Sequence, residues 1–217
     1  MRELNFGDAQ FLFAAAAWTL ALFVMSLVGG GVIGLVLALM RTSSSRVLRL
    51  LAIGYFRVIQ GTPLLMQIFL VYFGTALLGY EIGALLSAAL ALSINAGAFL
   101  GETWASSIVS VGKGQSEAAH VLGLPYVTTM SRIVIPQAMR IAIPPTVGFL
   151  VQMVKGTAMA SFVGFVELAR AGQMLNAATF RPFLIFGSVS ALYFAICWPL
   201  SLLSTHLEQR LGRAYRR

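Results

Sequence analysis

The feature that most constrains the fold is a series of long apolar runs with few charges inside them. A helix needs about 20 mostly apolar residues to cross the hydrocarbon core of a bilayer. In that core every backbone N–H and C=O must be bonded within the protein, so such runs fold as helices. The sequence predicts an all-α polytopic membrane protein, one transmembrane domain over residues 1–217, with five spans at about residues 14–40, 62–79, 82–108, 145–165 and 183–206.

The remaining composition supports this class and argues against others. The chain is 59% hydrophobic and 10% charged, whereas a soluble domain carries about 25% charged residues. The net charge of +8 does not indicate nucleic-acid binding, because the basic residues are scattered at helix ends with no aromatic-interleaved groove. A single cysteine, Cys197, allows no internal disulfide. His120 and His206 do not have a metalloprotease spacing, and we predict no metal site.

The basic residues are divided unequally between the two sides of the membrane. Five spans place the termini on opposite sides, and loops rich in Lys and Arg stay in the cytoplasm. Eleven Lys and Arg residues follow spans one, three and five, and three lie on the other side. We therefore expect the N-terminus outside, the C-terminus in the cytoplasm, and the loop of about residues 112–143 in the cytoplasm. Residues Arg2, Arg170 and Arg181 form the smaller group.

Glycine and proline predict where helices meet, begin and bend. Gly30 and Gly34 have the spacing that lets another helix approach closely, and we favour a helix of the same subunit over a dimer contact. Thr62-Pro63 is expected to open the second span after an amphipathic helix over residues 46–60 at the membrane surface. Pro144-Pro145 is expected to open the fourth span, and Pro199 to kink the fifth.

A short polar segment, residues 114–125, lies between two of these apolar blocks. Ser116 is expected to N-cap a helix in which Glu117 complements the helix dipole, and Gly123 to end it in the left-handed conformation. Pro125 then suits the start of a second short helix, and Pro136 its end. The pattern predicts a two-helix elbow, suited to docking a partner.

Several motifs of this region resemble one family. Glu117-Ala118-Ala119 with Gly123, followed by the run at 133–138, is similar to the "EAA" loop of permease subunits in bacterial ABC importers. The segments at 61–67, 113–115 and 163–173 resemble the polar amino-acid branch of that family, so the resemblance covers about residues 55–175. Two positions depart from the branch: Gln60 replaces the usual Arg, and Gly156 follows Lys155 in place of an acid or amide.

The resemblance implies a fold, a location and a set of partners. The fold would be that of a type I ABC importer permease, spanning the bacterial cytoplasmic (inner) membrane with a cytoplasmic coupling loop. The partners would be a dimer of ATP-binding cassette ATPases that carries ATP and Mg, a second permease that is either identical or similar, and an extracellular or periplasmic amino-acid-binding protein. The residues implied in ATPase coupling are Glu117, Ala118, Ala119, Gly123, Leu124 and Pro125.

The chain itself lacks the signature of an ATPase. A phosphate-binding loop needs a first glycine where Ser107 stands, and Ser or Thr after the lysine where Gly114 stands. We therefore expect no enzyme activity and no cofactor in this chain, with ATP hydrolysed by a separate subunit. One alternative is an ion-coupled secondary transporter with Glu102 as the relay, although we find no internal repeat or broken helix of the kind such folds show. Another is a membrane enzyme or channel subunit that uses Glu102 and Lys155.

Polar residues inside the predicted spans indicate where cargo passes. Such residues are costly in lipid and usually face a bundle interior or a water-filled cavity. Asn95 and Glu102 share one helix face, as do Gln152 and Lys155. Glu102 suits the ammonium and Lys155 the carboxylate of an amino acid. The alternative is that Glu102 and Lys155 pair with each other and hold the spans together. Neither the amino acid carried nor the identity of the second permease follows from these residues.

Overall fold

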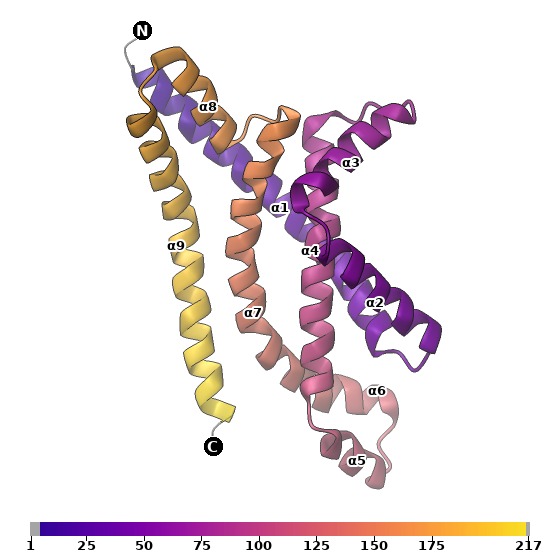
Figure 1. Ribbon diagram of the computed structural model, residues 1–217. Helices are drawn as coiled ribbons and strands as arrows, with labels where there is room; N and C mark the ends of the chain where they lie inside the picture. The colour runs from indigo at the N-terminus through magenta and orange to yellow at the C-terminus, as the bar shows by residue number, and fades with distance from the viewer. Residues whose placement is uncertain (1–4, 216–217) are drawn as a thin grey trace.

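The computed structural model describes residues 5–215, with side chains as far as Arg210. Arg2, Arg216 and Arg217, which enter the count of Lys and Arg above, lie outside the described residues. Every regular element within them is helical, which confirms the predicted all-α class. In chain order the elements are α1 (Phe6–Thr42), α2 (Arg46–Gln60), α3 (Leu64–Leu77), α4 (Gly83–Ser110), α5 (Lys113–Val121), α6 (Tyr126–Thr129), η1 (Met130–Val134), α7 (Ile135–Gly156), η2 (Thr157–Val163), α8 (Leu168–Thr179) and α9 (Pro182–Tyr215) (Figure 1).

Membrane-spanning length is reached by four helical stretches within the described residues. They are Phe6–Thr42, Gly83–Ser110, Tyr126–Val163 and Pro182–Arg210. The consecutive helices α2 and α3 also pass the length and hydropathy test when taken together, although they meet at an angle of 100°. Near the expected second span the amphipathic α2 therefore leads through a sharp bend into the apolar α3, as a broken span or a re-entrant loop.

The two ends of the bundle differ in what they carry. The elbow helices α5 and α6, the connection between α1 and α2, and the C-terminal part of α9 lie at the lower end of the view in Figure 1. The start of α1, the connection between α3 and α4, and α8 lie at the upper end. The fold thus gathers at one end the loops that the charge count assigns to one side of the membrane.

Helices α1 and α4 cross at closely spaced glycines. A Cβ placed on Gly101 would lie 2.9 Å from the Gly34 carbonyl oxygen, and one on Gly34 would lie 3.0 Å from the Gly101 nitrogen. A Cβ on Gly30 would lie 2.5 Å from the Ala96 Cβ. Since these contacts lie within one chain, the prediction that the Gly30 and Gly34 spacing serves packing inside the subunit is confirmed. Its counterpart on α4, Gly97 and Gly101, has the same four-residue spacing.

Two expectations about proline are wrong. Pro144 and Pro145 lie inside α7 and do not open it. Thr146 donates to the Ala142 carbonyl (2.7 Å), and Ser204 of α9 donates to the Pro144 carbonyl (3.3 Å). Proline is tolerated within membrane helices, and these two bonds tie the proline segment to its own turn and to α9, although the carbonyls that the prolines free are those of Arg140 and Ile141.

Pro136 likewise does not end the second elbow helix. The turn before it widens into the π-helix η1, where the Ile135 N–H donates to the Met130 carbonyl, five residues back. A widened turn relieves the clash that a proline ring makes with the carbonyl four residues earlier. Helices α6, η1 and α7 therefore follow one another without a break. Pro199 lies within α9, as expected.

A buried carboxylate organises the end of the bundle opposite the elbow. Glu167 is 0% exposed and N-caps α8, accepting hydrogen bonds from the backbone N–H of Ala169 (2.9 Å) and Arg170 (2.8 Å). The Tyr193 hydroxyl of α9 donates to the same carboxylate (2.7 Å). The next backbone N–H, of Leu168, donates to the Thr19 hydroxyl of α1 (3.1 Å). This cluster fixes α8 to both α1 and α9.

Candidate functional site

The elbow is closed by a left-handed glycine. Gly123 has φ 70°, which confirms the predicted conformation. Its N–H donates to the His120 carbonyl (2.9 Å), and the Leu124 N–H donates to the Ala119 carbonyl (3.0 Å). Bonds of this kind satisfy carbonyls that the helix end leaves free. A Cβ on Gly123 would meet no atom within 4 Å, so backbone strain alone demands glycine within this chain.

The start of α5 differs from the prediction. Its N-cap is Gly112, so Ser116 lies within the helix and caps nothing, and Glu117 belongs to the second turn. Pro125 is the N-cap of α6, not its first residue. The sequence signal was misleading because Ser and Glu are common at helix starts, whereas here α4 ends at the extended Val111 and α5 begins directly after Gly112.

The tip of the elbow exposes apolar side chains. Val121 is 86% exposed, Leu122 76% and Val127 74%, whereas Ala119 is 1% exposed and faces the chain's own interior. Helices α5 and α6, which carry these residues or end at them, lie at the far end of the bundle (Figure 1). Val121 and Leu122 lie outside the spans, whereas Val127 lies in the first turn of the stretch Tyr126–Val163. Exposed apolar surface outside the membrane is typical of a protein docking site. Glu117, Ala118, Gly123 and Pro125 are exposed around the same turn, and Leu124 is half-buried.

The break between α2 and α3 is held by one buried glutamine. Gln67, 8% exposed, donates to the Ile59 carbonyl (2.7 Å) and to the carbonyl and hydroxyl of Thr62 (3.1 and 3.0 Å). Its own carbonyl oxygen accepts a hydrogen bond from the Asn95 amide of α4 (3.1 Å). A Cβ on Gly61 would lie 2.7 Å from the Arg57 carbonyl oxygen. The segment Gly61-Thr62-Pro63 thus turns sharply, and Gln67 bonds the carbonyls that the turn frees.

The Thr62 prediction requires a correction at this break. The Thr62 hydroxyl donates to the carbonyls of Val58 and Ile59, both at 3.1 Å, and so closes the end of α2. It does not cap α3, whose N-cap is Pro63. A hydroxyl can donate backwards to a preceding turn as well as accept from a following one, and here the backward contact is formed.

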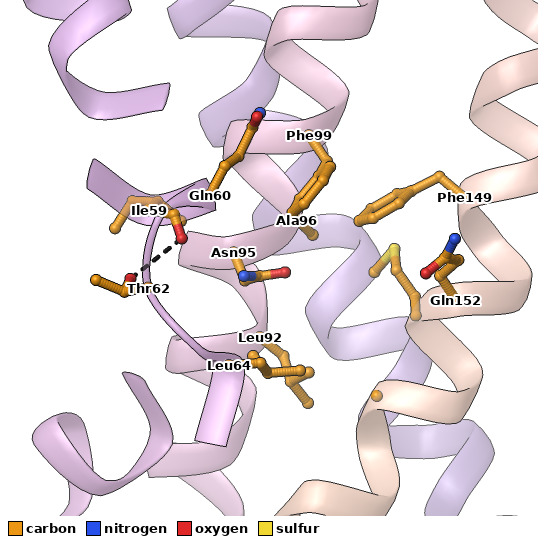
Figure 2. A pocket seen from close by; sticks show the side chains of 12 residues that line it. Ile59, Gln60, Thr62, Leu64, Leu92, Asn95, Ala96, Phe99, Phe149 and Gln152 are labelled. Carbon is orange, nitrogen blue, oxygen red and sulfur yellow. Dashed lines mark hydrogen bonds between the residues drawn. The ribbon is translucent and has the colours of Figure 1, made fainter. Parts of the chain in front are cut away.

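A cavity of about 230 Å³ lies beside the break, between the α2–α3 turn, α4 and α7. Asn95 extends into it from α4 and Gln152 from α7, and the rings of Phe99 and Phe149 stack across it with centroids 5.0 Å apart (Figure 2). Gly156 also lines it, where a Cβ would lie 3.2 Å from Leu64 Cδ2. Two amides and two aromatic rings therefore face one small space inside the bundle.

Glu102 is joined to this cavity through Gln60. The Gln60 amide donates to Glu102 Oε2 (2.7 Å) and, more weakly, to the Ala98 carbonyl (3.4 Å), and Gln60 itself lines the cavity. A neutral amide, unlike the arginine usual in the resembling branch, leaves the carboxylate charge uncompensated. The rim of the cavity is therefore acidic.

Lys155 lies elsewhere. It lines a separate groove of about 420 Å³ between α7 and α9, together with Tyr193, Cys197 and Trp198. Gln152 and Lys155 are three residues apart, a rotation of about 60° around a helix, which suffices to point them into different grooves. Lys155 and Glu102 line no common cavity. No group of three His, Cys, Asp or Glu side chains suited to a metal forms among the described residues.

Sequence reasoning singled out Asn95 and Gln152 but missed Gln67, Phe99 and Phe149. Gln67 lies within the motif at 61–67, but no role was predicted for it. A signal for a buried polar role exists, since this amide lies four residues after Pro63 inside an apolar run. The two phenylalanines carry no signal of their own, because aromatic residues on membrane helices face lipid as often as a cavity.

These observations define a class. A bundle of apolar helices with a polar cavity inside it, and an exposed elbow at one end, is a membrane transport subunit. Residues 30–216 match the family described as "Binding-protein-dependent transport system inner membrane component". The chain belongs to this family.

Individual relatives agree with this assignment. The chain is 35% identical over 197 residues to the L-cystine transport system permease protein TcyB of Bacillus subtilis, covering 90% of this chain and 84% of the relative. It is 33% identical over 205 residues to the arginine transport system permease protein ArtQ of the same organism, covering 93% and 92%. A solved structure of an amino acid ABC transporter with histidines superposes with a TM-score of 0.87 at 32% identity, covering 96% of this chain and 100% of that chain.

The family assignment confirms the predicted permease class and does not favour the secondary-transporter alternative. The absence of a broken helix does not support this distinction, because α2 and α3 meet at 100° and form either a broken span or a re-entrant loop. The distinction therefore rests on the family and the elbow.

Proposed function

We propose that this chain is the permease subunit of an ATP-driven ABC importer for polar amino acids. The observation that carries the cargo class is the cavity of about 230 Å³ lined by the amides of Gln60, Asn95 and Gln152. Relatives named for cystine and arginine transport support it. The cavity lies below the roughly 300–1,000 Å³ typical of sites for drug-sized ligands, which favours a single small amino acid over a peptide.

Each polar group at the cavity has a proposed role. A zwitterion that leaves water needs a partner for each charged end. Glu102 at the rim attracts the ammonium group, and the amides of Asn95 and Gln152 orient the carboxylate and the polar side chain. The groove that holds Lys155 is proposed as a second stretch of the path, on the face of α7 next to the one that lines the cavity, where the lysine meets the carboxylate.

The elbow is proposed as the coupling surface for an ATPase. Its exposed apolar tip, with Glu117, Ala118, Ala119, Gly123, Leu124 and Pro125 around the turn, would dock into a cleft of an ATP-binding subunit that carries ATP and Mg. Hydrolysis would occur there, and no catalytic role falls to this chain. The elbow would then lie in the cytoplasm with the C-terminus, and the N-terminus outside, where a binding protein delivers cargo to a permease pair.

Reconstitution tests the function. The chain, co-expressed with its ATPase and second permease, is placed in proteoliposomes with the matching binding protein, and uptake of a panel of labelled amino acids is measured. We expect ATP-dependent uptake of one or a few polar amino acids and co-purification of the ATPase. Uptake driven by a proton or sodium gradient without ATP would contradict the proposal.

Substitutions test the path. Glu102→Gln and Asn95→Ala should each lower uptake, by factors that differ between amino acids, while ATPase stimulation by the binding protein is partly retained. Lys155→Met tests the second groove in the same assay. Gln173→Ala, an exposed position on α8, serves as the control and should leave uptake unchanged. Equal loss for every substrate, or loss of membrane expression, would mark the substituted residues as structural.

A further inference from the structure

A second cleft, separate from the cavity and of about 460 Å³, lies at the elbow end of the bundle. It is formed where the α1–α2 connection, the end of α4, the start of α5 and helices α6 and η1 meet. Its walls carry three cationic side chains and one acidic one: Arg41, Arg49, Lys113 and Glu117. Of these four residues, only Glu117 has a role in the transport mechanism proposed above.

The cations in the cleft have no protein partner. Among the residues that the structure describes, none of Arg41, Arg49 and Lys113 makes a side-chain hydrogen bond or an ion pair. Arg41 and Arg49 are nevertheless half-buried, whereas Arg46 and Arg132 at the same end of the bundle are exposed. Cations held close together and partly out of water repel each other unless an anion lies between them.

Helix ends add to the positive field. α2 and α5 both begin at this cleft, and neither has a side chain that caps its first N–H groups. Lys113 is the first residue of α5, and Arg49 lies in the opening turns of α2. A cation near a helix N-terminus meets the positive end of the dipole and is disfavoured, whereas an anion is favoured there. The cationic side chains and the helix dipoles therefore both favour an anionic ligand.

The cleft is also lined by apolar side chains. They are Ile108, Val109, Val111, Met130 and Val134. Ile108 and Val109 lie near the end of a membrane-spanning helix, so this part of the lining adjoins the hydrocarbon region. A site lined by both cations and apolar residues fits an amphiphile whose head group is anionic.

We propose that this cleft binds a phosphate group, supplied by an anionic phospholipid of the leaflet on the elbow side. Arg41 and Arg49 can each direct several N–H donors at phosphate oxygens, and Lys113 adds a third charge. Free inorganic phosphate offers the same oxyanion without an acyl chain, and the experiment separates the two sources. The assignment of this leaflet as cytoplasmic rests on the proposed topology, but the site itself does not.

A bound phosphate would join elements that otherwise touch little. The three cations belong to different elements: Arg41 to α1, Arg49 to α2 and Lys113 to α5. An anion between them would tie the elbow to the α1–α2 connection, so anionic lipid would tune how firmly the elbow is held.

Native mass spectrometry of the purified full-length permease tests the proposal. Phosphatidylglycerol or phosphatidylcholine is titrated in detergent, without ATP or amino acid, so the result does not depend on the transport function. The variant Arg41→Gln/Arg49→Gln/Lys113→Gln should bind phosphatidylglycerol at least about tenfold more weakly than wild type, since each cation near an anionic head group contributes about 1 kcal/mol. Phosphatidylcholine should bind weakly to both.

The matched control removes the same charge from exposed positions, Arg46→Gln/Arg132→Gln/Arg140→Gln, and should stay within about twofold of wild type. An equal loss of phosphatidylglycerol affinity in both variants would show that surface charge in general attracts the lipid, and it would overturn the proposed site. Inorganic phosphate that displaces phosphatidylglycerol supports the oxyanion site. Phosphate binding without phosphatidylglycerol binding overturns the lipid as the source. If the triple variant does not fold, Arg49→Gln replaces it, and an unchanged affinity there overturns the proposal.

Discussion

At the scale of single residues, the absence of a side chain sets how closely α1 and α4 approach. A Cβ on Gly101 would lie 2.9 Å from the Gly34 carbonyl oxygen and 3.1 Å from the Leu37 Cβ. Both obstacles belong to helix backbone or to the first side-chain atom, which cannot rotate away. Gly31, one helical position from Gly30, meets nothing within 4 Å. Packing therefore requires glycine at Gly101, whereas Gly31 has room for a side chain.

We predict that Gly101→Ala destabilises the protein by about 1–3 kcal/mol, the usual cost of forcing extra volume into a packed interface. Gly31→Ala is the matched control and should be neutral or stabilising by about 0.5–1 kcal/mol, because alanine favours the helix. Thermal unfolding in detergent measures both. A melting temperature for Gly101→Ala at or above that of Gly31→Ala would contradict the close crossing.

A second residue-scale prediction concerns the carboxylate that caps α8. Tyr193→Phe removes the hydroxyl that donates to Glu167 and leaves an oxygen of a fully buried carboxylate with one donor fewer. Loss of one partner of a buried polar group costs about 1–3 kcal/mol. Tyr72→Phe on α3 removes the same hydroxyl oxygen from a half-buried site, where it makes no hydrogen bond to any described residue. This variant should cost less. Equal melting temperatures for the two variants would argue against the cluster.

The polar residues show how far sequence reasoning reaches at this scale. Asn95 and Gln152 were identified because an amide inside an apolar run needs a partner or water, and both line the cavity. Lys155 was grouped with Gln152 on helical spacing, but a rotation of about 60° separates their grooves. Glu167 lies within the motif at 163–173 and received no role, whereas it is fully buried and caps α8. Burial of a charge at a helix start depends on which helices surround it, and a single sequence does not reveal that.

At the scale of elements, the elbow combines a strained turn with an exposed tip. Gly123 and Gly79 both have positive φ, 70° and 83°, and a Cβ on either meets no atom of the chain within 4 Å. They differ in place: Gly79 follows α3, at the end of the bundle opposite the elbow (Figure 1). The two glycines carry equal backbone strain in different surroundings.

We predict that Gly123→Asp abolishes ATP-driven uptake while the protein still inserts and folds. Gly79→Asp should carry a similar strain, about 1–2 kcal/mol, yet retain most uptake, because no partner ATPase contacts that end. Uptake in proteoliposomes and ATPase stimulation are measured for both. Wild-type uptake by Gly123→Asp, or equal loss in the two variants, would show that the elbow is not the coupling surface.

Helix positions could be predicted from the sequence far better than helix starts. Apolar runs located every long helix, because length and hydropathy suffice for a membrane span. Proline misled at Pro136, Pro144 and Pro145, since all three lie within a continuous helical stretch, which widens into a π-turn before Pro136. The helix boundary at Gly61 was predicted, because Thr62-Pro63 marks a helix start. The bend of 100° there was not predicted, because Gln67 acts across it from the next helix.

At the scale of the whole molecule, one end of the bundle holds the elbow, the α1–α2 connection and the end of α9 (Figure 1). The other end holds the α3–α4 connection, where Tyr80 is 69% exposed. Gln209, near the end of α9, is also exposed. These two positions report on opposite sides of the membrane.

We predict that a membrane-impermeant thiol reagent applied to intact cells labels Tyr80→Cys and spares Gln209→Cys. The native Cys197 is buried and should give little background. Labelling after cell lysis shows that both cysteines react when reached. The reverse pattern would invert the protein, place the elbow outside the cell and remove the basis for ATPase docking.

The unbroken path from α6 through η1 to α7 has a mechanical consequence. Tyr126 on the elbow and Gln152 at the cavity lie on one continuous helical rod, and 26 helical steps of 1.5 Å give it a length of about 40 Å. A continuous helix transmits movement along its length, and its weakest points are the π-turn and the two prolines. A rotation imposed at the elbow therefore reaches the cavity wall through the helix itself, and the bends at these points set how far the wall moves.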